Sequence, residues 1–223
     1  MISGGIAMNA VILGCSSMAK AIDAAQKKTG TDHPVYLISR KYHSSPGQMR
    51  LHLMEALHTI PESSDTVLVA MGFCGGSWKD IDTEKRIVIP KVDDCITLML
   101  HTDDSPHFNL KQATHLYMRD PYGDDFGPMH EKLRMKYGEE KGDATFARWF
   151  EPFTDLDIID AGICDCHSST FTDKARRDAQ AIGCRLNHIK GSNIIMEKLV
   201  SGKWDSQFIV NEPHRPLSEE NFR

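Results

Sequence analysis

No stretch of this sequence stays apolar for the roughly 18 residues that a membrane-spanning helix requires, so we expect no transmembrane segment. The start, Met1–Ala10, lacks both the basic residues and the long apolar stretch of a secretory signal. Neither sign of charge is in strong excess, because 26 Lys and Arg residues face 31 Asp and Glu residues and the net charge is −5. This balance argues against nucleic-acid and anionic-membrane partners. We therefore expect a cytoplasmic protein.

Several common catalytic signatures are also missing. The sequence contains no Walker phosphate loop, no nucleophile elbow, no H-E-x-x-H zinc motif and no G-x-G-x-x-G dinucleotide fingerprint. The D-x-H-x-x-G motif of cobalamin-binding proteins is absent as well. Six cysteines are present, but without the close C-x-x-C spacing that makes a metal motif specific. In a cytoplasmic protein they are expected to be thiols or metal ligands, and not disulfides.

Short apolar runs alternate with helical patterns along the chain, which is typical of an α/β fold. Glycines follow several helical patterns and are expected to end those helices, and Pro46 suits the first turn of one helix. The expected strands are residues 10–14, 35–38, 66–71, 86–90, 156–161, 184–189 and 208–210. The expected helices include one ended by Gly30, 131–150 with a break at Gly138 or Gly142, 170–182 ended by Gly183, and one capped by Ser192.

The order of these elements predicts two Rossmann-like βαβ lobes, with mostly parallel sheets, facing a shared cleft. The first lobe spans residues 8–100, with Met8 as a second candidate start, and the second spans 154–212. The polar, proline-containing stretch 101–153, with the acidic pair Asp124 and Asp125, is expected to be a connector or lid. Residues 213–223 are expected to form a polar tail. A cleft shared by two lobes is a common site for a small-molecule ligand.

Cys15, Cys74 and Cys95 each lie where a predicted strand ends. The carboxyl ends of parallel strands share one edge of a sheet, and such folds bind ligands there. Three thiolates can hold an iron–sulfur cluster with one iron open, or zinc with one further ligand. The alternative is that each cysteine is a small buried apolar residue. Three glycines surround Cys74 and favour close approach of a ligand to the backbone, namely Gly72, Gly75 and Gly76.

His43 and Asp94 are the candidate catalytic or flanking groups. His43 follows the second predicted strand, where an imidazole can ligate a metal or transfer a proton, although it can equally serve as a helix-capping loop residue. Asp94 directly precedes Cys95, and its carboxylate would raise the pKa of that thiol unless a cation intervenes. The pairing favours a metal over a free nucleophile. Asp94 is also a natural cap for a helix that begins at Ile96.

The tract Cys164-Asp165-Cys166-His167 follows another predicted strand and is dense in potential metal ligands. Such a short pattern can bind a metal, and it can also be an accidental loop. Cys184 begins a predicted strand, at the opposite edge of the sheet, and is expected to be structural.

Several segments together resemble the prokaryotic family known as domain of unknown function 1638. The resemblance covers most of the chain, and the segments around Cys74 and Cys95 are its most specific parts. The matching segments are 14–15, 43–46, 71–76, 88–98, 136–140, 159–162 and 199–205. Two stretches depart from the family pattern: 113–120 lacks the usual Gly-Trp turn, and 164–167 is richer in ligands.

The resemblance implies that Cys15, His43, Cys74, Asp94 and Cys95 belong to the family's shared polar set. Family members are often encoded near corrinoid-dependent methyltransferases of anaerobes. The leading hypothesis is therefore a metal- or iron–sulfur-binding protein, carrying an iron–sulfur cluster or zinc, in anaerobic one-carbon or sulfur metabolism. A second hypothesis is an accessory module that binds a corrinoid or a methylated amine and serves a corrinoid protein or methyltransferase. A third is a thiol enzyme with Cys74 as nucleophile and His43 as base.

Overall fold

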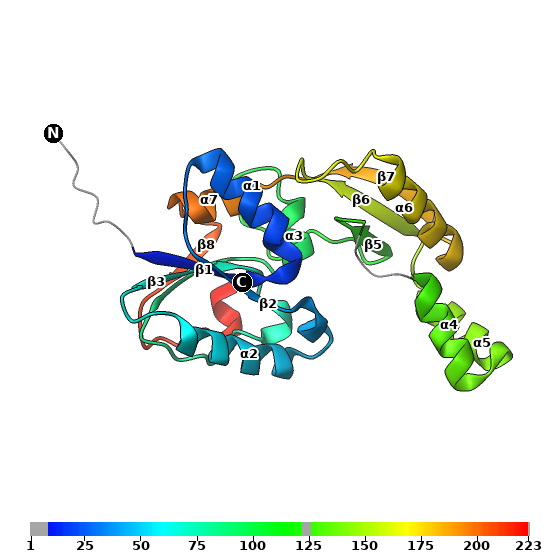
Figure 1. Ribbon diagram of the computed structural model, residues 1–223, viewed down its shortest axis with the longest axis horizontal. Coiled ribbons are helices and arrows are strands. Elements are labelled where there is room, and N and C mark those ends of the chain that lie inside the picture. The colour runs from blue at the N-terminus through cyan, green and yellow to red at the C-terminus, as the bar shows by residue number, and fades with distance from the viewer. Residues whose placement is uncertain (1–8, 122–125, 223) are drawn as a thin grey trace. The chain divides into compact units, whose positions relative to one another are not determined.

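A computed structural model describes residues 9–121 and 126–222 (Figure 1). Met8 and the pair Asp124–Asp125, which figured in the sequence analysis, lie outside these residues. The chain forms two compact units. Unit 1 contains the residues up to Leu110 and those from Asn193 onward, and unit 2 is the continuous segment Lys111–Ser192. Unit 2 is thus an insertion between two parts of unit 1.

Unit 1 is built on a five-stranded sheet with helices before and after its strands. Its strands are β1 (Ala10–Cys15), β2 (Val35–Ile38), β3 (Thr66–Ala70), β4 (Arg86–Pro90) and β8 (Phe208–Asn211). Its α-helices are α1 (Ala19–Thr29), α2 (Pro46–Thr59), α3 (Cys95–Leu100) and α7 (Ile194–Ser201). Its 3-10 helices are η1 (Ser16–Met18), η2 (Arg40–Ser44), η3 (Cys74–Gly76) and η4 (Glu219–Phe222).

The sheet of unit 1 has the order β2-β1-β3-β4-β8. The first four strands are parallel, and β8 pairs antiparallel with β4. Helices α1 and α7 cover one face of this sheet and α2 covers the other (Figure 1). From β1 the chain first moves outward to β2 and then returns to β3 on the other side of β1. The carboxyl ends of β1 and β3 therefore flank the topological switch point, where open α/β sheets bind ligands.

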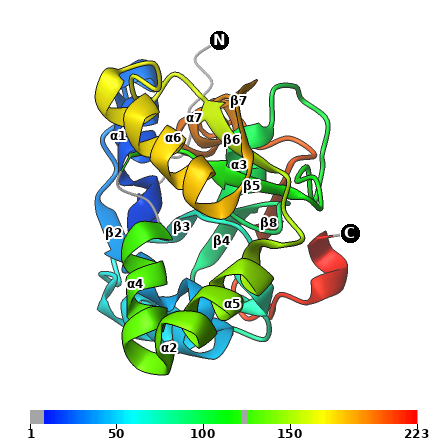
Figure 2. The ribbon, with the colours of Figure 1, turned by 90° about the vertical axis from the view of Figure 1, so that its right-hand side faces the viewer.

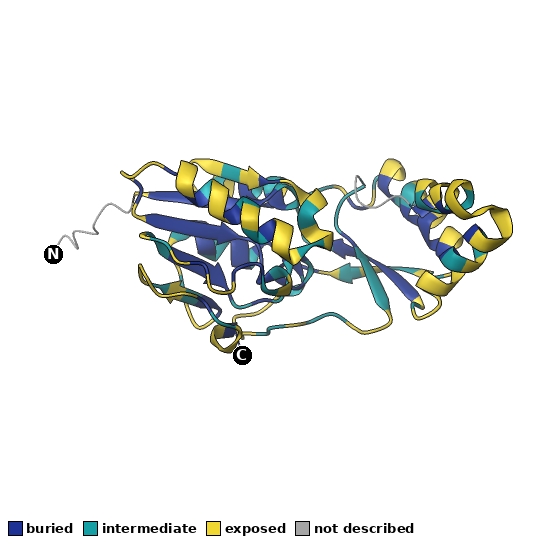
Figure 3. Ribbon diagram, turned by 90° about the horizontal axis from the view of Figure 1, so that it is seen from below, coloured by how far each residue is buried: buried dark blue, intermediate teal, exposed yellow. Residues whose placement is uncertain are grey.

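The core of unit 1 is formed by its central strands β1, β3 and β4, which are buried along nearly their whole length, whereas the edge strands β2 and β8 are partly exposed. All residues of β1 and β3 are buried, whereas the helices expose one side (Figure 3). Continuous apolar strands of this kind are expected where helices cover both faces of a parallel sheet. Helix α1 ends at Gly30, which adopts the left-handed conformation (φ 72°), and Pro46 begins α2 behind a Ser45 cap. The end of α1 and the start of α2 follow the signals seen in the sequence.

Unit 2 contains a smaller, wholly parallel sheet. Its strands are β5 (His115–Met118), β6 (Asp155–Asp160) and β7 (Arg185–Lys190), in the order β5-β6-β7 (Figure 2). Its helices are α4 (Phe126–Tyr137), α5 (Glu139–Phe150) and α6 (Ser169–Ile182). Phe171 and Ala175 of α6 pack against Leu156 and Ile158 of β6, so α6 covers one face of the sheet.

The helix predicted over 131–150 breaks at Gly138, one of its two expected positions. Gly138 has a φ of 83° and separates α4 from α5. Gly142 lies within α5 instead, at a point where α5 packs closely against α4. A Cβ at Gly142 would lie 2.6 Å from the Cα of Arg134. Gly142 therefore allows the backbones of α4 and α5 to approach closely.

The α/β class with mostly parallel sheets is confirmed, but the units divide the chain at other places than the predicted lobes. Most of 101–153, expected as a connector or lid, supplies β5, α4 and α5 to unit 2. Conversely, α7 and β8, expected in the second lobe, belong to unit 1. β8 pairs with the outer edge of β4, and α7 packs against α1 and β3. After unit 2 the chain thus returns to unit 1 and adds the last strand, β8, to its sheet.

Two smaller expectations also differ from the structure. The residue that caps α7 is Asn193 and not Ser192. The expected polar tail is more than that over its described residues, 213–222, because Leu217 and Phe222 are each 2% exposed. The ring of Phe222 packs on that of Phe73, with 4.3 Å between their centroids.

Within the described part of the chain, every helix is too short or too polar to cross a bilayer.

Candidate metal centre at the edge of the five-stranded sheet

Cys15 lies at the carboxyl end of β1 and is fully buried. Its Sγ is 3.0 Å from Nε2 of His43, which η2 carries after the neighbouring strand β2. The hydroxyl of Ser17 donates a hydrogen bond to the same sulfur at 2.9 Å. The sequence therefore placed Cys15 and His43 correctly at one sheet edge. Helix α2 is capped by Ser45, so His43 is not needed as its cap.

Cys95 begins α3 and is 2% exposed. It forms a side-chain hydrogen bond with Cys15, so two thiols from separate strand ends meet. Asp94 is the N-cap of α3, and its Oδ1 accepts from the backbone N–H groups of Ile96 and Thr97 at 2.9 and 3.0 Å. The capping role expected for Asp94 is thus present. A catalytic role for Asp94 or His43 stays a prediction.

Cys74 opens the tight turn η3 after β3 and is partly exposed. Its φ of 49° is unusual for a residue other than glycine. Its backbone N–H donates to the carbonyl of Asp93 at 2.6 Å, and that of Phe73 donates to Val92 at 2.9 Å. The turn that carries Cys74 is therefore bonded directly to the turn that leads to Cys95.

The glycines around Cys74 let several turns come together. A Cβ on Gly72 would lie 2.6 Å from the backbone nitrogen of Asp94, so only glycine fits at this contact. Gly75 has a φ of 66°, and a Cβ there would lie 2.9 Å from Cγ of Pro46. The segment after β3 thus contacts both the segment after β2 and the segment after β4 at the carboxyl edge of the sheet.

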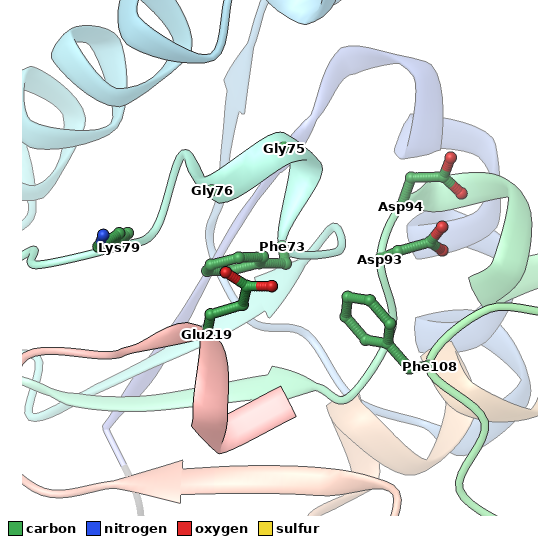
Figure 4. Close-up of a pocket in the computed structure, with 8 residues that line it drawn as sticks. All are labelled: Phe73, Gly75, Gly76, Lys79, Asp93, Asp94, Phe108 and Glu219. Atoms are coloured by element: carbon green, nitrogen blue, oxygen red, sulfur yellow. The ribbon is translucent and has the colours of Figure 1, made fainter. Parts of the chain in front are cut away.

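A pocket of about 500 Å³ opens beside these turns (Figure 4). Gly75 and Gly76, expected as ligand-binding residues, form part of its wall, whereas Gly72 packs behind it. Figure 4 shows that the wall combines the turn after β3, the turn before α3 and the C-terminal η4. Its lining residues are Phe73, Gly75, Gly76, Lys79, Asp93, Asp94, Phe108 and Glu219.

The environment of Cys15 keeps its thiol protonated. Its pKa is raised to about 12, first by the hydrogen bond to Cys95 and then by burial, while His43 and Ser17 act in the opposite direction. A thiol of this kind is a poor nucleophile at neutral pH. A bound metal cation would displace the proton, because the thiolate is the form that ligates.

Among the residues that the structure describes, one group brings three potential ligand atoms within 4.8 Å of one another, and it is not the predicted one. Cys166, His167 and His188 form this group, in unit 2, and could hold a metal ion. The thiols of Cys15, Cys74 and Cys95 are not gathered this closely, so a site on all three stays a prediction.

Some residues around these sites were not found from the sequence. His188 lies in β7, 21 positions after His167, and a single histidine in a strand gives no local signal. Its place on the same sheet face as Leu186 was the only available hint. Phe108 and Glu219 were missed because their roles depend on contacts between distant segments. Ser17 lies only two positions after Cys15, and a single serine in a turn gave no specific signal. Cys184, expected to be structural, packs against the core of unit 2.

The sequence was compared with protein families, with curated proteins and with solved structures. No curated protein and no solved structure gave a match. The profile of a family described as a protein of unknown function, DUF1638, matches residues 37–200. The matched region includes His43, Cys74, Cys95 and the group formed by Cys166, His167 and His188, and it extends over most of the chain. The chain therefore belongs to the DUF1638 family.

Proposed function

We propose that the protein binds a metal at the switch-point edge of unit 1, using Cys15 and Cys95, with Cys74 as third thiolate and His43 as fourth or flanking group. The observation that carries this proposal is the meeting of Cys15 with both His43 and Cys95. Sulfur and imidazole are the ligands of zinc, and three thiolates are those of an iron–sulfur cluster with one open iron. Each proposed ligand lies at or after the end of a different strand of the sheet, so all four lie toward its carboxyl edge.

Two further features support a metal ligand over a free nucleophile at Cys15. Cys15 is buried beside another thiol, and its raised pKa removes the anionic form that attack would need. The adjoining pocket is lined by Phe73, Gly75 and Asp94, which are chain neighbours of Cys74 and Cys95, and not by the proposed ligands themselves. A centre with an open coordination position next to such a pocket would polarise a bound substrate.

The test is metal and sulfide content, with an absorbance spectrum, on protein purified without oxygen. Every sample carries His188→Ala, which removes one ligand of the Cys166, His167 and His188 group, so that group should not contribute metal. In that background we expect about one zinc, or iron with sulfide, per chain, lost in a Cys15→Ser/Cys95→Ser double variant. His43→Gln, at an exposed position, should weaken binding without a folding defect. Cys184→Ser is the matched control and should keep the metal.

The outcomes separate the possibilities. Iron with sulfide identifies a cluster, and zinc without colour identifies a zinc site. Metal that remains in the double variant, or folded His188→Ala protein that carries none and takes up none, would overturn the proposal. Circular dichroism of each variant distinguishes lost ligands from lost fold.

A second candidate function is binding of a small organic cation, such as a methylated amine, in the pocket of Figure 4. The wall carries three carboxylates, Asp93, Asp94 and Glu219, against the single cation Lys79. It also carries the rings of Phe73 and Phe108. Aromatic faces with nearby carboxylates are the usual recognition elements for alkylated ammonium groups. A corrinoid protein or methyltransferase that would accept such a ligand stays a prediction.

Calorimetric titration with tetramethylammonium tests this second function. We expect binding that weakens about fivefold or more in Phe108→Ala, since one cation–π contact contributes about 1 kcal/mol. Choline and its neutral isostere 3,3-dimethylbutanol provide the control for charge. Equal affinity for these two molecules would exclude cation recognition.

A further inference from the structure

The group formed by Cys166, His167 and His188 lies wholly in unit 2 and is separate from the centre proposed above. Its ligand atoms all lie within 4.8 Å of one another. Cys166 and His167 come from the turn between β6 and α6, and His188 comes from β7. The two imidazole rings are stacked, with centroids 4.8 Å apart and planes at 11°.

The pleat of the sheet explains why these residues meet. Ile158 of β6 faces α6, and Asp160, two positions later, projects from the same face. His188 is the register partner of Ile158, so it projects from this face as well. Cys166 completes the apolar cluster beneath α6 and is 2% exposed. The turn between β6 and α6 thus places Sγ of Cys166 on the same sheet face as His188.

Asp160 adds a carboxylate next to this group. Its Oδ2 is 3.7 Å from Nε2 of His167, and its other oxygen, Oδ1, accepts from the N–H of Gly162 at 3.3 Å. The same carboxylate is hydrogen-bonded to the Cys166 thiol. A carboxylate beside a ligating histidine is the usual outer partner that orients the ring and increases its basicity.

We propose that Cys166, His167 and His188 bind one zinc-class divalent cation, oriented by Asp160 and with the fourth coordination position open to solvent. One thiolate and two imidazoles form a donor set that zinc and cobalt accept in tetrahedral geometry. Cys166 is buried, whereas both histidines are exposed, so water reaches one side of the ion. Three protein ligands with an open position are the arrangement of reactive zinc sites, and not of closed structural ones.

Other roles for Cys166, His167 and His188 fit the structure less well than metal binding. A free Cys166 nucleophile is disfavoured, because burial and the neighbouring Asp160 raise its pKa to about 11. A purely structural cysteine would not need two exposed histidines beside it. Cys164, the other cysteine of the tract, bonds the carbonyl of Arg119 at 3.5 Å and packs on the core, so it is not part of the group.

Cobalt titration of the full chain tests this site directly. The first centre is removed by Cys15→Ser/Cys95→Ser, so success or failure here is independent of the proposed function. We expect one equivalent of Co²⁺, with a near-ultraviolet thiolate-to-metal band and intense visible bands of four-coordinate cobalt. Zinc should displace the cobalt stoichiometrically.

Matched variants assign the ligands. Cys166→Ser should abolish the thiolate band, and His188→Ala, at an exposed position, should lower affinity at least 100-fold without unfolding. Asp160→Asn should lower it about 10- to 100-fold, as expected for an outer partner. Cys164→Ser and His58→Ala, the latter an exposed histidine of α2, should change nothing. Absence of the thiolate band, or an unchanged affinity in His188→Ala, would show that the three residues do not form a metal site.

Discussion

At the scale of single residues, Gly72 shows how the centre in unit 1 depends on backbone contact. A Cβ at Gly72 would lie 2.6 Å from the backbone nitrogen of Asp94, and no flexible side chain can yield there. We expect Gly72→Ala to lower the free energy of unfolding by about 1–3 kcal/mol or more, because overpacking forces the backbone to shift. It should also weaken metal binding, since the turns of Cys74 and Cys95 move apart.

The control is Gly47→Ala in α2, where nothing lies within 4 Å of the added methyl group. Replacing a helical glycine there should stabilise the protein by about 0.5–1 kcal/mol. Denaturant unfolding measures both changes. Equal effects of the two substitutions would mean that the close contact at Gly72 does not constrain the turn.

Cys15 and Cys74 should differ sharply in reactivity. Cys15 is fully buried with its pKa raised to about 12, whereas Cys74 is partly exposed on a strained turn. In folded, metal-free protein near pH 8, we expect iodoacetamide to modify Cys74 at least tenfold faster than Cys15. Mass spectrometry of timed digests measures the two rates. Labelling of Cys15 at the rate of Cys74 would contradict the buried, protonated state of Cys15.

At the scale of elements, the α4–α5 hairpin is joined by a charged cluster that titrates in acid. Asp143 of α5 accepts from Nη2 of Arg134 at 2.9 Å and pairs with His130 at 2.7 Å. Mainly because of Arg134, the pKa of Asp143 is lowered to about 2. A depressed carboxyl pKa stabilises the folded state above its ordinary range near pH 4, and this contribution is lost as pH falls toward 2.

We therefore expect Asp143→Asn to lower the melting temperature near pH 6 and to have little effect near pH 2. Thermal unfolding followed by circular dichroism across this range measures the difference. The shift should also shrink in high salt, because the side chains of the cluster are partly exposed to solvent. A melting temperature that falls equally at both pH values would assign the effect to packing instead.

The C-terminal η4 lines the pocket through Glu219 and is anchored by the ring of Phe222. This ring is 2% exposed and lies against Phe73 and Phe108. Phe222→Ala should cost about 3 kcal/mol of unfolding free energy, and Phe222→Leu less than about 1.5 kcal/mol. Chemical denaturation of the two variants provides the comparison. Near-neutral behaviour of Phe222→Ala would mean that η4 is not docked in solution.

The elements that local patterns define were predictable, and those defined by distant partners were not. β1, β3 and β4 are continuous apolar runs, and Gly30 and Gly183 end their helices as expected. β5 was missed because its sequence, His-Leu-Tyr-Met, is short and only partly buried. The meeting of Cys15, His43 and Cys95 followed from the rule for parallel strand ends. The assignment of β8 to the first sheet did not, because pairing with β4 spans more than a hundred residues.

At the scale of the whole molecule, unit 2 is one continuous insertion. All of its sheet pairs are internal to Lys111–Ser192, and those of unit 1 are internal to the remainder. We expect residues 111–192 expressed alone to fold cooperatively and to keep the Co²⁺ spectrum described above. Replacing them in the full chain by a flexible Gly-Ser linker should leave the unit 1 centre able to bind its metal.

Circular dichroism and metal titration of the two fragments check this division. A fragment that is unfolded by itself, but regains structure on mixing with the other, would show that the units depend on each other for stability.

The return of the chain to β4 also sets an order of events during synthesis. When unit 2 has left the ribosome, it already holds every strand of its own sheet. Unit 1 at that moment still lacks α7 and β8, and one edge of β4 has no neighbour. An open strand edge is where unwanted pairing between chains begins. The nascent protein therefore has its most vulnerable interval between translation of residue 90 and translation of residue 211, and slow synthesis across unit 2 would lengthen it.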